Sequence, residues 1–237
     1  MSEKKFDIYF EFNHSGLNLA AFSKTSGKLE YYKEQTYKSY FNNYKELNFE
    51  KLDKLLEVNI LEIEKSTEEF VRDIYLIVDT PQSTSIKLSV TKNNEGHKIN
   101  KEDAMYLVQD AKQQLLKSNQ DLGITHIIVE NYVLDNVQYK FFPSKKKCTN
   151  FSIDVIFICF PKDLFKSFEK LFLKQQVYIT QFVCSNYIKT FGFINKGQKM
   201  CECAKDIVQG SNKQEVVSIP KELKKKGFFE KLFHFFK

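Results

Sequence analysis

Three short stretches of alternating polar and apolar residues near the start of the chain restrict its fold more than any other feature. They begin at Phe6, Leu17 and Leu29, and the turn-forming sequences Asn-His-Ser-Gly and Ser-Gly separate them. A period of two residues is the pattern of a β-strand, and turns this short join neighbouring antiparallel strands. The chain is therefore predicted to begin with a three-stranded meander over residues 6–37.

The rest of the chain alternates between helices and strands. Leucine and isoleucine recur at helical spacing over residues 49–65, and two more amphipathic helices are predicted after the N-cap residue Asn100 and after Pro161. Strands are predicted at residues 70–81, 83–93, 125–136, 137–142, 150–160 and 177–184. A short helix is expected beyond them, followed by a polar linker over residues 205–220. Elements in this order predict an α+β fold.

The basic residues of the chain are almost all lysine. Arg72 is the single arginine among 36 lysine and arginine residues, and the net charge is +6. A basic protein invites an anionic partner, either nucleic acid or a membrane. Arginine makes the bidentate contacts by which bases and phosphates are recognised, so we expect no nucleic-acid partner.

The cysteines and the remaining motifs bear on metal binding, catalysis and location. The five cysteines are an odd number without the paired spacing of a zinc site, so we expect buried thiols, no disulfide framework and no metal. No nucleotide-binding fingerprint or nucleophile elbow occurs, so no catalytic residue and no cofactor is predicted. No segment has the pattern of a signal peptide or of a membrane-spanning helix, and the protein is expected to remain in the cytoplasm.

Residues 221–237 combine lysines with phenylalanines. On a helical wheel, six apolar side chains of this segment fall in an arc of ~160°. They are Phe228, Phe229, Leu232, Phe233, Phe235 and Phe236, and the lysines before them are Lys224, Lys225 and Lys226. An aromatic face next to lysines is typical of a helix that lies in the interface of an anionic membrane. A helix ~16 Å long can lie on a bilayer but cannot cross it.

Two other roles fit the same amphipathic pattern. Such a helix also docks in the groove of a partner protein, or packs on the core of its own protein. The polar linker expected before it disfavours packing on its own core. Membrane binding is therefore the leading prediction for residues 221–237.

The middle of the chain resembles FtsA, the actin-like bacterial division protein that anchors FtsZ filaments to the membrane. The resemblance lies in the order of a helix with an acidic start, a strand, a loop that begins with proline, a second strand, a helix and a last strand. The residues that fall in the order of the family are His126, Tyr132, Leu134, Asp135, Pro143, Phe151, Asp154 and Val177. This stretch is similar to the inserted 1C subdomain of FtsA, which is of the SHS2 type.

Residues 1–98 are similar to part of the actin-like, ribonuclease H-like subdomain 1A, and residues 221–237 to the membrane-targeting helix of FtsA. The phosphate-binding hairpin departs from the D-x-G-[ST] pattern of the family, because Glu11 stands in place of the aspartate and Asn13 in place of the glycine. Glycine lets the backbone approach an anion. No second phosphate motif follows residue 184, so the resemblance is to a truncated relative and no ATP site is carried over.

These features predict a non-enzymatic, membrane-tethered adaptor in bacterial cell division. Its predicted parts are a fragment of actin-like subdomain 1A (residues 1–98), an SHS2/1C-like subdomain (99–184), a short helix and linker (185–220) and the membrane-binding helix (221–237). The predicted location is the cytoplasmic face of the inner membrane. Its predicted partners are the anionic membrane surface and, through the 1C-like part, division proteins or another copy of the chain.

Two alternatives stay open. One is a relative of the pilus-assembly protein PilM, which shares the actin-like plan with an inserted domain and binds a peptide of a membrane partner. The other is a nucleotide-binding protein with a degenerate site.

Overall fold

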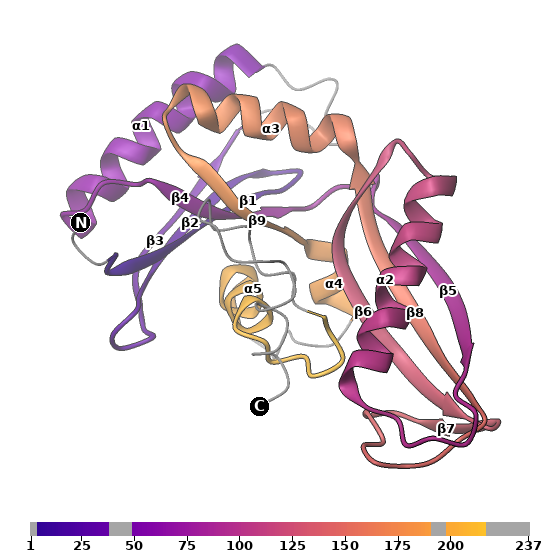
Figure 1. Cartoon of the computed structure of the whole chain (residues 1–237). Helices are drawn as coiled ribbons and strands as arrows, with labels where there is room; N and C mark the ends of the chain where they lie inside the picture. The colour runs from indigo at the N-terminus through magenta and orange to yellow at the C-terminus, as the bar shows by residue number, and fades with distance from the viewer. Residues whose placement is uncertain (1–3, 38–48, 191–197, 217–237) are drawn as a thin grey trace. The chain divides into compact units, whose positions relative to one another are not determined.

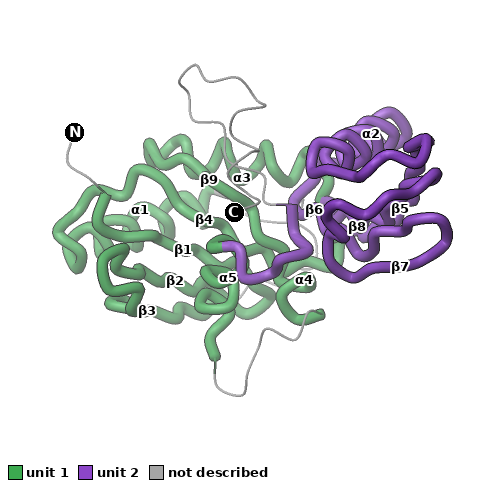
Figure 2. The backbone as a smooth tube through the Cα atoms, turned by 60° about the horizontal axis from the view of Figure 1, so that its bottom comes forward, with its two compact units in different colours: residues 1–83, 160–209 green, residues 84–159, 210–237 purple. Residues whose placement is uncertain are grey.

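The chain forms two compact units, which are described separately (Figure 2). The computed structural model describes residues 4–37, 49–190 and 198–216 (Figure 1). Unit 1 consists of residues 1–83 and 160–209, and unit 2 of residues 84–159 and 210–237. Unit 2 is thus inserted into the sequence of unit 1, and the chain returns to it after residue 209.

The structure divides the chain at other places than after residues 98 and 184. Strand β5 (Thr84–Asn93) belongs to unit 2 because it pairs along its whole length with β8 (Asn150–Pro161). Helix α3 (Lys162–Lys174) and strand β9 (Tyr178–Cys184) belong to unit 1, where β9 pairs with β4 (Asp73–Val78). These pairings join segments far apart in the sequence, so local periodicity does not reveal them.

Unit 1 is built on a five-stranded sheet with the strand order β3-β2-β1-β4-β9. Its first three strands are β1 (Phe6–Phe12), β2 (Gly16–Ser23) and β3 (Leu29–Thr36). They pair antiparallel, whereas β4 and β9 continue the sheet in the direction of β1. The predicted meander and the α+β class are confirmed, and the carboxyl ends of β1, β4 and β9 meet at one edge of the sheet.

Helices α1 (Phe49–Thr67) and α3 cover one face of this sheet (Figure 1). The rings of Phe10 and Phe12 in β1 lie 5.4 Å from Phe172 and 5.0 Å from Phe168 of α3, between centroids. All four side chains are fully buried. Burial of each ring contributes roughly 1.5–3 kcal/mol, so this aromatic cluster is a main source of the stability of unit 1.

Helix α5 (Met200–Val208) covers the opposite face of the sheet (Figure 1). Its buried side chains are Cys201, Cys203, Ala204 and Ile207. The ammonium groups of Lys199 and Lys205 lie 3.6 Å and 4.9 Å from the ring centroids of Tyr32 and Phe22. Cation–π contacts of this kind add to the burial of the apolar side chains and hold α5 on the meander.

Much of the stretch predicted to be a polar linker, residues 205–220, is ordered in contact with other elements. Helix α5 continues to Val208, and residues 214–216 pair with a strand of unit 2. The short helix expected after β9 is confirmed as α4 (Ser185–Thr190). The linker prediction was wrong for these residues. Residues 209–215 have the polar composition of a linker, and the sequence does not show that they contact a distant strand.

Unit 2 contains a four-stranded sheet with the order β5-β8-β6-β7 and one long helix. The elements not yet given are α2 (Lys101–Ser118), β6 (Leu122–Leu134) and β7 (Val137–Tyr139). Asn100 caps α2: its side chain accepts from the amide of Asp103 at 2.8 Å, and the Asp103 carboxylate accepts from the amide of Asn100 at 2.9 Å. The apolar side of α2 packs on the sheet and forms the core of the unit.

Gly16 provides a test of how tightly the meander is built. A Cβ atom at this position would lie 2.2 Å from the carbonyl oxygen of Gln35 in the neighbouring strand β3. The change Gly16→Ala should therefore push β2 and β3 apart and lower the free energy of unfolding by about 1–3 kcal/mol. Urea unfolding followed by circular dichroism measures this loss. Ser15→Ala in the same turn serves as the control, and equal midpoints for the two variants would contradict the close approach.

Candidate functional site

Polar side chains gather where three strands of the unit 1 sheet end. In open sheets with parallel strands, ligands bind outside the carboxyl ends of the strands. The ends of β1, β4 and β9, with the start of β2, place six polar residues at this edge. They are Glu11, Asn13, Asn18, Asp79, Ser185 and Lys189, and we call them the strand-end cluster.

Glu11 is the buried carboxylate of the strand-end cluster, with 7% of its surface exposed. The amide nitrogen of Asn18 donates to its Oε2 at 3.0 Å, and that of Asn13 donates to its Oε1 at 3.3 Å. Burial raises the pKa of Glu11 above its usual range, and the two amide hydrogen bonds offset part of the rise. Glu11 is thus a buried acid held by neutral amide donors.

Asp79 is the second carboxylate of the strand-end cluster and follows β4. The hydroxyl of Ser185 donates to its Oδ1 at 2.7 Å, and the ammonium group of Lys189 donates to its Oδ2 at 2.9 Å. Its own amide donates to the carbonyl of Phe12 at 2.9 Å. These hydrogen bonds join the ends of β1, β4 and β9, so Asp79 stabilises this edge of the sheet.

In the β1–β2 turn, two backbone amides donate to the side chain of Asn13. The Oδ1 atom of Asn13 accepts from the amides of Ser15 and Gly16, at 2.9 Å and 2.8 Å, and from the hydroxyl of Ser15 at 2.8 Å. Asn13 therefore closes the turn, because its side chain engages both backbone amides.

No group of three or more histidine, cysteine or acidic residues is placed to hold a metal ion in the part of the chain that the structure describes. All five cysteines are buried, as their sequence context predicts. Burial raises the pKa of Cys159 to about 11 and of Cys201 to about 12, so these thiols stay protonated at neutral pH.

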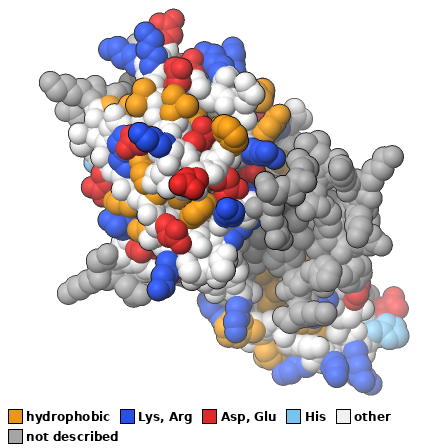
Figure 3. Space-filling model, turned by 90° about the vertical axis from the view of Figure 1, so that its left-hand side faces the viewer, with side chains coloured by type: hydrophobic (Ala, Val, Ile, Leu, Met, Phe, Trp, Pro, Cys, Tyr) orange, Lys and Arg blue, Asp and Glu red, His pale blue; other side chains and the backbone are white. Residues whose placement is uncertain are grey.

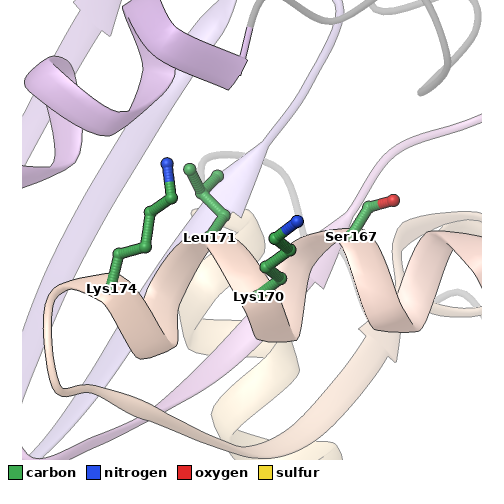
Figure 4. A pocket seen from close by; sticks show the side chains of 4 residues that line it. All are labelled: Ser167, Lys170, Leu171 and Lys174. Carbon is green, nitrogen blue, oxygen red and sulfur yellow. The ribbon is translucent and has the colours of Figure 1, made fainter.

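A surface hollow of ≈ 250 Å³ lies along helix α3 (Figure 4). Ser167, Lys170, Leu171 and Lys174 line it from one side of the helix. Lys174 also donates to the carboxylate of Asp53 in α1 at 3.2 Å. No residue of the strand-end cluster lines the hollow, and its polar lining consists of one serine and two lysines.

The charges on the face of the molecule drawn in Figure 3 are mixed. Acidic, basic and apolar side chains are interspersed across the visible described surface.

The predicted membrane-binding residues, from Lys224 to Phe236, lie outside the described residues, which end at residue 216. Among the described helices, none is long and apolar enough to cross a membrane.

The residues that carry the resemblance to FtsA lie mostly in unit 2, where they have structural roles. Tyr132, Leu134 and Phe151 belong to its core. Asp135, in the turn after β6, accepts from the amide of Asn150 at 2.8 Å. Asp154 accepts from the hydroxyl of Ser89 and from the amide of Asn131. Pro143 is also buried, while Val177 lies in unit 1, before β9.

The sequence prediction missed two parts of the site. Asp79 and Ser185 were not singled out, although an acid directly after a buried strand is a signal of a functional edge. The partners of Asp79 come from α4, more than a hundred residues later. Only the parallel pairing of β4 with β9 brings them together.

No family model matches the chain, and no curated protein matches its sequence. Solved structures with a similar fold include the three described next. The PilM–PilN complex of type IV pilus biogenesis has a TM-score of 0.48 and 8% identity, over 78% of this chain and 49% of that chain. The cytoplasmic domain of EpsL, an inner membrane component of the type II secretion system of Vibrio cholerae, has a TM-score of 0.35 and 10% identity, over 77% and 57%.

The third similar structure is a protein of Bacteroides thetaiotaomicron with an actin-like ATPase fold and unknown function. Its TM-score is 0.32 and its identity 11%, over 79% of this chain and 56% of that chain. The present chain thus spans about half the length of each of the three.

The raised pKa of Glu11 predicts a specific pH dependence of stability. Because the folded state binds this proton more tightly than the unfolded state, its stabilising contribution is complete below pH ~4.5 and is lost as the pH rises through the folded pKa. The change Glu11→Gln removes this titration, so the variant should lose less stability than the parent over that range. Urea unfolding at a series of pH values measures both profiles.

Glu30→Gln, which removes an exposed carboxylate of β3, is the matched control for this comparison. Its profile should follow that of the parent. Profiles of parent and Glu11→Gln that run parallel would show that Glu11 is not the buried acid described here.

Proposed function

We propose that this protein is a membrane-tethered adaptor of bacterial cell division, related to FtsA, and that it has no enzymatic activity. The observation that carries the proposal is the geometry of the β1–β2 turn, next to the strand-end cluster. The amides of Ser15 and Gly16 donate to Asn13 rather than pointing outward, where a phosphate would bind. A domain of this plan whose phosphate-binding donors are engaged acts by binding other molecules rather than by hydrolysing ATP.

Residues 221–237 support the tether. Their sequence combines a phenylalanine face with preceding lysines, the pattern of a helix that lies on an anionic membrane. The proposed location is the cytoplasmic face of the inner membrane. In this account the tail supplies the attachment, and the two units supply the contacts to protein partners.

Unit 2 is the proposed site for those protein partners. It contains most of the residues that resemble the SHS2-type 1C subdomain, through which FtsA contacts other FtsA subunits and division proteins. Its described surface exposes Tyr106, Val137 and Phe141 by 64%, 53% and 64%. Large apolar side chains of this kind serve as anchors in protein interfaces.

An adaptor related to PilM, which would bind a peptide of a membrane partner, is the second candidate. The insertion of unit 2 between β4 and α3 is common to the plans of both families, so it favours the two equally. Identification of the proteins that cross-link to unit 2 in cells distinguishes them. Division proteins support the first proposal, and pilus proteins support the second.

The tether is tested by placing a charge on the apolar face of the tail. The change Phe233→Glu should release the protein from anionic vesicles in a sedimentation assay, because a carboxylate cannot enter the acyl boundary without a large cost of desolvation. His234→Glu adds the same charge on the polar face and serves as the control. It should reduce binding far less, and equal sedimentation of the two variants would argue against an interfacial helix.

The absence of an ATP site is tested by thermal unfolding. A ligand that binds the folded state at 100 times its Kd stabilises it by about 2.7 kcal/mol, which raises the melting temperature by several degrees. We expect ATP with magnesium to leave the melting temperature of this protein unchanged. A rise that increases with the ATP concentration would instead support a nucleotide-binding protein with a degenerate site.

A further inference from the structure

Residues 214–216 form a short strand on β6 of unit 2, and we call them the clamp strand. Two backbone hydrogen bonds hold it antiparallel to β6. The amide of Val129 donates to the carbonyl of Gln214 at 2.8 Å, and the amide of Val216 donates to the carbonyl of Ile127 at 2.7 Å. The clamp strand thus lies on the edge of β6 beside the short strand β7.

The side chains of the clamp strand are also held by unit 2. The Nδ1 atom of His126 lies 2.7 Å from Oε1 of Glu215, and the two side chains are exposed by only 0% and 4%. The amide nitrogen of Gln214 donates to the carbonyls of Glu130 and Val129, at 3.0 Å and 3.2 Å. Breaking such a buried pair costs free energy, so these contacts resist release of the strand.

The clamp strand determines where the tail leaves the folded protein. Lys221, the first residue of the amphipathic segment, follows Val216 by five residues. Five extended residues span at most ~17 Å. By chain length alone, Lys221 therefore lies no further than this from Val216, which is bonded to β6.

We propose that the clamp strand brings the surface of unit 2 around β6 and β7 to the anionic lipid. This inference rests on the proposed membrane tether and names the surface that the tether presents. Lys140 and Lys213 are exposed beside the clamp strand, and Gln214 contacts the carbonyl of Lys140. Both lysines add to the basic charge of residues 221–226 at the point where the tail leaves.

The experiment measures energy transfer from unit 2 to the membrane in the full-length chain. A donor fluorophore is attached to cysteine introduced by Gln138→Cys on the exposed side of β7, since all five native cysteines are buried. The acceptor is a labelled lipid in vesicles that contain anionic phospholipid. The variant Val216→Pro lacks the amide that donates to Ile127 and frees the clamp strand. Ser211→Ala, an exposed residue before the strand, is the control.

We expect strong transfer in the parent and in Ser211→Ala, and a roughly twofold fall in Val216→Pro, because the released segment lengthens the flexible link to the tail. Sedimentation with the vesicles should be the same for all three proteins. Equal transfer in the parent and Val216→Pro would overturn the inference while leaving the tether intact. Failure of the parent to sediment would overturn the proposed tether, and the inference with it.

Amide hydrogen exchange without vesicles tests the clamp strand by itself, so the two failures remain distinguishable. The amides of Val129 and Val216 should be protected from exchange in the parent. Both should lose protection in Glu215→Ala, because this change breaks the buried pair with His126. Rapid exchange of both amides in the parent would show that the clamp strand does not hold the tail, whatever the vesicles show.

Discussion

The sheet of unit 1 has apolar side chains on both faces, so helices have to cover both faces. Successive residues of β1 show this requirement, because Tyr9 and Phe10 point to opposite faces and are exposed by only 1% and 0%. Helices α1 and α3 cover the face of Phe10, and helix α5 covers the face of Tyr9. After α5 the chain continues into unit 2, so one segment covers the second face and also leads to the clamp strand.

The polar residues of the strand-end cluster bond to one another across the strand ends of unit 1. Glu11 and Asp79 still lie at the carboxyl edge of the parallel strands, where ligands bind in many open sheets. Here Asn13, Asn18, Ser185 and other neighbours complete their hydrogen bonds. The cluster thereby fastens the strand ends of unit 1, and this stabilising use of its polar groups is the physical basis for proposing an adaptor rather than an ATPase.

Periodicity predicted the elements, but not their partners. The meander, helix α2 with its cap at Asn100, and helix α3 after Pro161 depend on neighbours in the sequence, so local patterns predicted them. The boundary of unit 2 depends on the pairing of β5 with β8, and the clamp strand on Glu215 meeting His126, which lies 89 residues away. The polar composition of residues 209–215 gave no sign of these contacts, because buried polar residues with distant partners resemble a linker.

The central claim is that the tail attaches a folded, non-enzymatic protein to an anionic membrane. Its most direct measurement is co-sedimentation with anionic and with neutral vesicles, comparing the full chain with a chain that ends at Pro220. The account predicts that the full chain pellets with anionic vesicles and that the shortened chain stays in the supernatant. If the two chains behave alike, the phenylalanine face is covered by protein, and the account of a membrane tether is contradicted.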